Sequence, residues 1–166
     1  MRMDTLSIFR YEGVIRKAII ALKYKYSTEI AKELADICVG NLKKMDLRHK
    51  NYLLMPIPLH WHRQNVRGFN QSEEVGKLIA HGMNWKYETN LLVKNISTKP
   101  QVGLKGSTRR KNLRGVFSLN PNCVLSTMYP VLIFDDVFTT GSTIGEATKV
   151  LKHAGFKRIL GITVAR

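Results

Sequence analysis

Three things are scarce in this chain of 166 residues: cysteine, acidic side chains and long apolar runs. The two cysteines, Cys38 and Cys123, lie far apart without paired spacing, so the sequence predicts neither a disulfide framework nor a zinc site. No apolar run approaches the roughly 20 residues that span a bilayer, and the first residues lack the apolar core of a signal peptide. We therefore expect no transmembrane segment and a reducing compartment, with the cytoplasm as the default.

The shortage of acids gives the chain an unusual charge. Lysine and arginine outnumber aspartate and glutamate 27 to 12, for a net charge of +15. A small phosphate-bearing ligand needs only a few cations, so this excess favours a polyanion such as nucleic acid, or another anionic surface. A general basic bias of the proteome is the alternative, because net charge alone does not identify a partner.

The apolar pattern predicts a single α/β domain over residues 1–166. The apolar fraction of 44% is ordinary for a globular protein, and the length allows a sizeable core. We expect short strands at 5–11, 51–55, 91–94, 115–119, from Val131, and at 159–164. We expect four helices: one at 14–24, one after the cap Ser27, one from the cap Asn70 to Gly82, and one that ends at about His153. The apolar face of the second helix includes Ile30, Leu34, Ile37, Cys38 and Leu42, and that of the third includes Val75, Leu78 and Ile79.

The segment 131–143, VLIFDDVFTTGST, carries the most chemical information. An apolar strand ends in two adjacent acids, Asp135 and Asp136, and a turn of threonines with one glycine leads into a helix. Open parallel sheets bind ligands at the carboxyl ends of their strands, and the free N–H groups at a helix start suit a phosphate. The residues therefore indicate a sugar-phosphate site, with a solvated strand end before an ordinary connection as the alternative.

The same segment resembles the 5-phosphoribosyl-1-pyrophosphate (PRPP) signature of type I phosphoribosyltransferases. The resemblance implies an open, mostly parallel, twisted sheet flanked by helices, with a flexible basic loop. It also implies that Asp135 and Asp136 are the catalytic acids, which accept hydrogen bonds from the ribose hydroxyls and reach Mg²⁺ through the ligand. No zinc is expected. The ribose and the 5′-phosphate are expected to meet both acids together with Val137, Thr139, Thr140, Gly141, Ser142 and Thr143.

Two basic segments complete the expected site. The segment 98–114 contains no acid and is too long for a simple connector, so we expect it to be functional. A solvated charge run is the alternative for its cations. We expect the pyrophosphate to be met from the turn after the 51–55 strand and from the basic segment, by Pro58, Leu59, Arg63, Arg67, Arg109 and Arg110. The candidates for nucleic-acid contacts are Lys99, Lys105, Arg109, Arg110, Lys111 and Arg114.

Three blocks resemble the ComF family in the same order. The block 56–80 contains the pattern Pro-x-Pro-Leu…Arg-Gly-Phe-Asn-Gln, and the block 98–119 contains Gln-x-x-Leu…Arg-x-x-Asn-x-x-x-x-Phe. The opening segment YEGVIRKAIIALKYKYSTEIAKELA resembles the first helices of the family. ComF-like proteins have a type I phosphoribosyltransferase domain and are associated with natural competence, the uptake of DNA for transformation.

The resemblance implies a protein that binds PRPP or a related ribose 5-phosphate ligand, supports DNA uptake and contacts single-stranded DNA. An active PRPP-dependent phosphoribosyltransferase of nucleotide salvage is the alternative. Many family members carry an N-terminal cysteine-rich zinc module, which two cysteines cannot build, so we expect residues 1–166 to be the transferase-like domain alone. Protein partners from a DNA-uptake machinery and a homodimer stay open.

Overall fold

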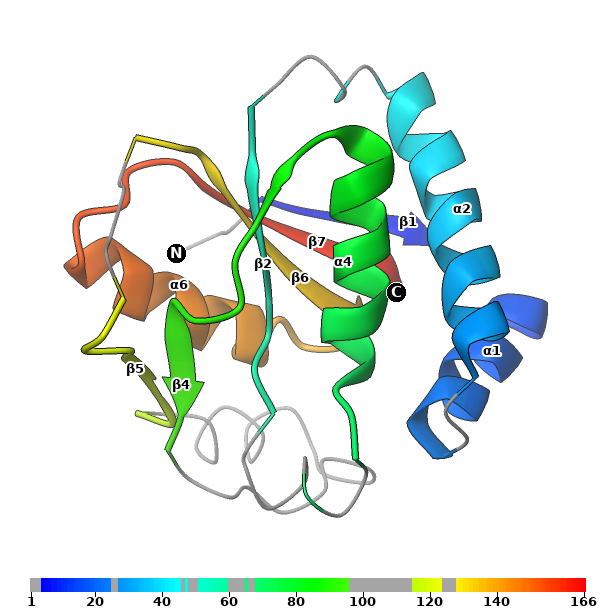
Figure 1. Ribbon diagram of the computed structural model, residues 1–166, viewed down its shortest axis with the longest axis horizontal. Coiled ribbons are helices and arrows are strands. Elements are labelled where there is room, and N and C mark those ends of the chain that lie inside the picture. The colour runs from blue at the N-terminus through cyan, green and yellow to red at the C-terminus, as the bar shows by residue number, and fades with distance from the viewer. Residues whose placement is uncertain are drawn as a thin grey trace.

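The computed structural model of the chain describes residues 4–24, 27–45, 47, 51–59, 65, 68–95, 115–123 and 128–166. Its main sheet contains five parallel strands in the order β1-β7-β6-β2-β3 (Figure 1). These strands are β1 (Thr5–Phe9), β2 (Leu53–Pro56), β3 (Lys86–Tyr87), β6 (Val131–Val137) and β7 (Ile159–Ala165). A separate antiparallel pair consists of β4 (Leu92–Lys94) and β5 (Phe117–Leu119). The expected open, mostly parallel sheet is confirmed.

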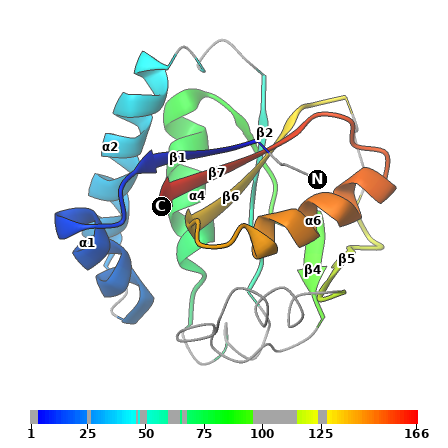
Figure 2. The ribbon, with the colours of Figure 1, turned by 180° about the vertical axis from the view of Figure 1, so that it is seen from behind.

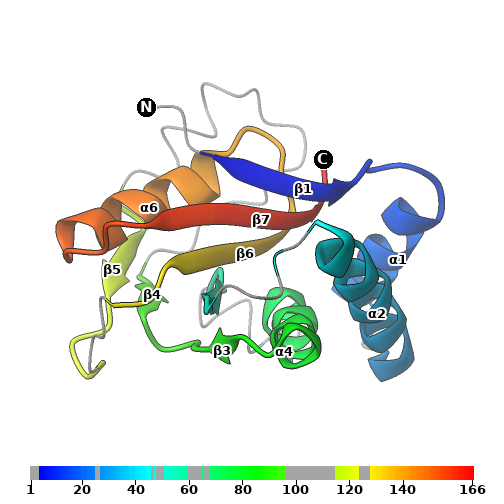
Figure 3. The same cartoon turned by 90° about the horizontal axis from the view of Figure 1, so that it is seen from above.

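Helices cover both faces of this sheet (Figures 2 and 3). They are α1 (Gly13–Tyr24), α2 (Thr28–Lys44), α4 (Gln71–Met83) and α6 (Ser142–His153). On one face, α1, α2 and α4 pack on Leu54, Phe134 and Ile162. On the other face, α6 and the β4–β5 pair pack on Met55 and Ile133. Because both faces of the central strands are covered, these strands are continuously apolar rather than alternating.

Side-chain caps fix the starts of two helices, as expected. The Ser27 hydroxyl accepts a hydrogen bond from the backbone N–H of Ile30 at 3.3 Å. Asn70 is 2% exposed, and its side chain accepts from the N–H of Ser72 at 3.1 Å and donates to Glu73 Oε1 at 2.8 Å. Asn70 Nδ2 also donates to the Ile57 carbonyl at 3.0 Å, so this cap ties the start of α4 to the chain just after β2.

Several expected details of the helices are wrong. Ile37 and Leu78 were expected to pack inward, but 45% and 37% of their surfaces are exposed. Helix α4 does not end at Gly82. It continues to Met83 and ends at Asn84, whose φ of 55° provides the left-handed cap. A Cβ at Gly82 would lie 2.8 Å from Val39 Cγ2, so this glycine allows α2 and α4 to approach closely.

The strands differ from their expected bounds by one or two residues at their ends, and the two-residue strand β3 was not expected. β1 ends at Phe9 rather than at 11. β5 begins at Phe117 rather than at 115, because Gly115 adopts a φ of 71° in a turn. Within the segments that the structure describes, no helix is long and apolar enough to cross a bilayer.

Candidate functional site

The two acids lie at the carboxyl end of β6, in the middle of the sheet. β6 pairs with β2 on one side and with β7 on the other, and Asp135 is in register with Thr163 of β7. The start of α4 and the end of α1 converge on the same edge of the sheet, as their contacts with the acids show. The sheet therefore holds both carboxylates where parallel sheets bind ligands.

Each carboxylate has partners from another element. Lys23 Nζ, at the end of α1, lies 2.8 Å from Asp136 Oδ2, and Gln71 Nε2 donates to the same oxygen at 3.2 Å. Asp135 Oδ1 accepts the backbone N–H of Asp136 at 2.9 Å and the Ser72 hydroxyl at 3.4 Å. A full positive charge thus meets Asp136, whereas Asp135 is bound by neutral donors.

This asymmetry appears in the electrostatics of the site. Burial, together with the adjacent Asp136 carboxylate, raises the pKa of Asp135 from its ordinary value of 3.8 to about 7. Lys23 and Lys94 oppose this rise with their positive charges. Burial works against the charge of Lys23, but the Asp136 carboxylate outweighs it and raises the pKa of the ammonium group. Near neutral pH, the site therefore contains one paired carboxylate and one that titrates.

The turn after β6 leads directly into α6. Gly141 adopts φ 69° and ψ 5° at the cap position, and its carbonyl accepts the N–H of Gly145 at 2.8 Å. A Cβ at this position would lie 2.8 Å from Phe138 Cζ, so glycine is required for both conformation and space. The hydroxyls of Thr140 and Ser142 lie 2.7 Å apart on the exposed side of the turn.

The first turn of α6 contains no acidic residue. Its cap residue Gly141 makes no side-chain hydrogen bond, and the N–H of Ser142 donates to the Thr140 hydroxyl at 3.4 Å. Helix N–H groups that lack an intrahelical partner, together with the helix dipole, attract an anion at this end. Thr139 is exposed, while Val137 and Thr143 are half-buried. The expected phosphate-binding turn therefore follows the acids directly, with its hydroxyls and helix start on the ligand edge of the sheet.

A cavity of about 720 Å³ lies along the same edge, between the start of α4 and the β4 strand. Pro58 and Leu59 line it, as do Glu73 and Lys94. The other expected pyrophosphate residues and the nucleic-acid candidates lie outside the described residues. These are Arg63, Arg67, Lys99, Lys105, Arg109, Arg110, Lys111 and Arg114.

Three residues of the site escaped the sequence analysis: Lys23, Gln71 and Ser72. Gln71 and Ser72 directly follow the predicted cap Asn70, and a helix that starts at the ligand edge presents its first side chains there. Their position directly after the predicted cap was the sequence signal that could have identified them as site residues. Lys23 gives no such signal, because it reaches Asp136 from a helix more than a hundred positions earlier in the sequence.

The donor set suits a cation that is shared with a ligand. Among the described residues, no group of three or more His, Cys, Asp and Glu could hold a metal ion. Mg²⁺ commonly binds one or two carboxylates and completes its shell with water and substrate phosphates. Two adjacent carboxylates beside the expected phosphate-binding turn fit that requirement, and Lys23 pairs with Asp136 rather than with Asp135.

Sequence comparison relates the chain to proteins named for competence and DNA utilization. It is 34% identical over 109 residues to competence protein F of Haemophilus influenzae, a match that covers 64% of this chain and 46% of that protein. It is 28% identical over 155 residues to DNA utilization protein YhgH of Salmonella typhimurium, covering 90% and 66%. Competence protein ComFC of Streptococcus pneumoniae is 28% identical over 160 residues, covering 96% and 67%. The chain thus spans about half to two thirds of these relatives.

Structural comparison identifies the fold. Glutamine PRPP amidotransferase from B. subtilis, complexed with ADP and GMP, matches 87% of this chain and 30% of its own with a TM-score of 0.53 and 14% identity. The structure of the allosteric regulatory enzyme of purine biosynthesis matches with the same values. No protein-family model matches the sequence. The expected resemblance is nevertheless confirmed: the chain is a homologue of competence protein F, ComFC and YhgH, and it has the type I phosphoribosyltransferase fold.

Proposed function

We propose that this protein binds PRPP, or a related ribose 5-phosphate ligand, at the carboxyl end of β6, and that it supports DNA uptake. The observation that carries the ligand proposal is the direct succession of the acids Asp135 and Asp136, the glycine turn at Gly141 and the acid-free start of α6. The two halves of this arrangement match the two halves of a ribose phosphate. Carboxylates accept hydrogen bonds from hydroxyls, and a helix start binds the phosphate.

The contacts of the acids suggest a division of labour. Asp136 is held in place by Lys23 and Gln71, so it offers a fixed, charged acceptor to a ribose hydroxyl. Asp135 has a pKa of about 7, so it can either donate or accept a hydrogen bond near neutral pH. The backbone N–H groups of 139–143 and the hydroxyls of Thr140 and Ser142 receive the 5′-phosphate.

Bound Mg²⁺ would neutralise charge on the pyrophosphate group. Asp135 and Asp136 are the residues that would hold it, through the ligand. Cationic side chains near the site would likewise meet the pyrophosphate group of the ligand. Lys94 lines the cavity of about 720 Å³, and its charge already acts on Asp135.

The names of the relatives support the biological role. They include competence proteins and a DNA utilization protein, and the net charge of +15 suits a protein that contacts single-stranded DNA. We infer that PRPP-type binding is the retained chemistry of the domain, and that contact with incoming DNA is its role. Because the chain spans only part of these relatives, both statements are proposals for this chain.

Calorimetric titration of PRPP with Mg²⁺ tests the ligand site. We expect micromolar binding by the wild type and no binding by Asp135→Asn/Asp136→Asn. The matched control is Asp36→Asn, which removes an exposed carboxylate from α2 and should bind as the wild type does. Absence of binding by the wild type, or unchanged binding by the double variant, would reject the site.

Contact with DNA has its own test. We expect single-stranded DNA to bind with an affinity that falls as salt rises, with a slope of log K against log salt near −0.7 per phosphate contacted. Fluorescence anisotropy of a labelled oligothymidylate measures it. Weak binding even at low ionic strength would count against the DNA role and leave the PRPP proposal standing.

One observation favours a second function, the active phosphoribosyltransferase. The cavity of about 720 Å³ is lined by Lys94, whose charge acts on Asp135, and it has room for an acceptor, within the usual range of about 300–1,000 Å³ for ligand pockets. In that reaction the C1–oxygen bond breaks and pyrophosphate leaves with the electron pair. The acceptor nitrogen forms the new bond to C1 and loses its proton. Pyrophosphate release that depends on a purine or a pyrimidine would establish it, and a screen without base-dependent release would exclude it.

A further inference from the structure

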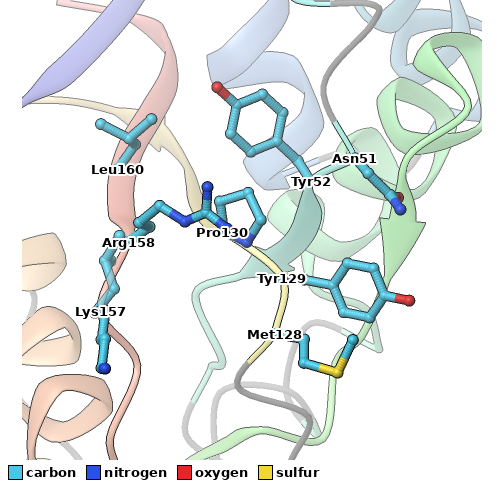
Figure 4. A pocket seen from close by; sticks show the side chains of 9 residues that line it. Asn51, Tyr52, Met128, Tyr129, Pro130, Lys157, Arg158 and Leu160 are labelled. Carbon is cyan, nitrogen blue, oxygen red and sulfur yellow. The ribbon is translucent and has the colours of Figure 1, made fainter.

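A second cavity, of about 710 Å³, lies at the opposite edge of the sheet from the acids. It is formed where three neighbouring strands begin: residues 51–52 precede β2, 128–130 precede β6, and 157–160 lead into β7. Figure 4 shows Tyr52 and Tyr129 near Pro130, with Arg158 and Leu160 facing them across the opening. We call this cavity the strand-start groove.

The groove combines the exposed apolar side chain of Met128 with the aromatic ring of Tyr129. Met128, on its rim, exposes 78% of its surface, although large apolar side chains are usually buried. Tyr129 is half-buried, and the Lys86 ammonium lies 4.0 Å from its ring centroid and donates to its hydroxyl at 2.7 Å. Tyr52, at the back of the groove, packs edge-on against Trp85 with ring centroids 5.3 Å apart. The aromatic surface of the groove is therefore positioned by its neighbours.

Positive charge borders the same surface. Lys157 and Arg158 line the groove and are exposed, and Lys86 contacts Tyr129 from β3. None of the described residues that line the groove is acidic. Rings that stack on bases, interleaved with cations that meet phosphates, are the combination by which proteins bind single strands without sequence preference. An apolar ligand would not require the cations, and a compact anion would not require the rings.

We propose that the strand-start groove binds single-stranded DNA, with a base against Tyr129 and Met128 and the flanking phosphates near Lys157, Arg158 and Lys86. This inference rests on the proposed contact with DNA and gives it a location. That location differs from the basic segment 98–114, which the sequence analysis favoured.

The groove and the ribose-phosphate site are far enough apart to act separately. Asp136 lies six positions after Pro130 in extended chain, which corresponds to about 20 Å along the strand. Charges at that distance are largely screened at physiological salt, where the Debye length is about 8 Å. DNA in the groove should therefore leave the PRPP site open, and both ligands should bind together.

Anisotropy of a fluorescein-labelled oligothymidylate, measured with the full chain, tests this location. We expect Lys157→Gln/Arg158→Gln to reduce the salt slope by up to about 1.4, since each lost phosphate contact removes about 0.7. We expect Tyr129→Leu to weaken binding about tenfold at constant salt, through lost stacking. The control Arg16→Gln/Lys17→Gln removes the same charge from an exposed part of α1 and should change the slope less.

A competition measurement separates the groove from other surfaces. With saturating PRPP and Mg²⁺, we expect the affinity for the oligothymidylate to change by less than twofold. Equal slopes for the groove and α1 variants would overturn the proposal, as would loss of DNA binding only in Arg109→Gln/Arg110→Gln. The proposal would also be overturned if an acidic peptide bound the groove while every groove variant bound DNA with the affinity of the wild type. Binding of DNA elsewhere refutes only this location, whereas no DNA binding by the wild type refutes the DNA role itself.

Discussion

Replacing Asp135 by asparagine should remove a large pH dependence from the stability of this protein. Its pKa in the folded protein is about 7, above its ordinary value of 3.8, because burial and the neighbouring Asp136 disfavour its charge. The folded state therefore binds this proton more tightly than the unfolded state does. The resulting stabilisation is complete below the unfolded pKa and is lost as the pH rises through the folded pKa.

The magnitude follows from these two values. Between about pH 5 and pH 8, the unfolding free energy of the wild type should fall by up to about 2.5 kcal/mol through this one group. That is a substantial part of the roughly 5–15 kcal/mol that stabilises a typical domain. The Asp135→Asn side chain keeps a carbonyl oxygen to accept the N–H of Asp136, so the variant should lose the dependence without losing this contact.

Urea denaturation, followed by far-ultraviolet circular dichroism from pH 5 to pH 8, measures the effect. Other titrating groups contribute to both proteins, so the informative quantity is the difference between their unfolding free energies. We expect the unfolding free energy of the variant to increase relative to that of the wild type as the pH rises, so that the variant is the more stable protein at pH 8. A difference that stays constant across the range would refute the argument. A constant difference would mean that Asp135 is charged over the whole range in both the folded and the unfolded state.

Three further changes follow from contacts of the site. Lys23→Met should destabilise the fold by about 1–3 kcal/mol at neutral pH, because it leaves the half-buried Asp136 without its cation; chemical denaturation measures this. Gly141→Ala should cost about 1–3 kcal/mol and abolish phosphate-ligand binding, because its φ is 69° and a Cβ would collide with Phe138; calorimetry and thermal unfolding report both losses. Asn70→Ala should cost about 2 kcal/mol in the same unfolding assay, through the lost cap of α4 and an unpaired Ile57 carbonyl.

Matched controls accompany these variants. Arg16→Met removes an exposed cation from the same helix as Lys23 and should be close to neutral. Gly145→Ala adds a methyl group with nothing within 4 Å, inside α6, and should stabilise by up to about 1 kcal/mol. Equal losses for Gly141→Ala and Gly145→Ala would contradict the turn argument, and an unchanged unfolding free energy for Lys23→Met would contradict the ion pair. A loss below about 0.5 kcal/mol for Asn70→Ala would mean that water replaces the cap.

Local signals account for what the sequence predicted well. The continuous apolar run of β6 identified a strand that is buried on both faces, and the caps Ser27 and Asn70 identified two helix starts. Exposure of Ile37 and Leu78 could not be read locally, because a helix can leave a residue of its apolar stripe uncovered where no neighbour packs.

Long-range contacts account for the rest. Lys23 meets Asp136 only because the sheet brings β1 and its following helix beside the last strands. The strand-start groove likewise draws on three segments that are separated by many residues, each without a motif of its own. Such sites depend on which strands become neighbours, and hydrophobic periodicity does not specify strand order.

The pairing of the first strand with the last sets an order of assembly for the protein. Ser7 and Thr163, whose hydroxyls lie 2.8 Å apart between β1 and β7, are 156 residues apart in the chain. Closing a loop of that length costs about 4–5 kcal/mol of chain entropy, so we expect this pairing to form late in folding. Helix α1 follows β1 directly, so Lys23 reaches Asp136 only when the two strands meet. The ribose-phosphate site would then receive its counter-charge last, and a chain that has folded only in part would hold an incomplete site.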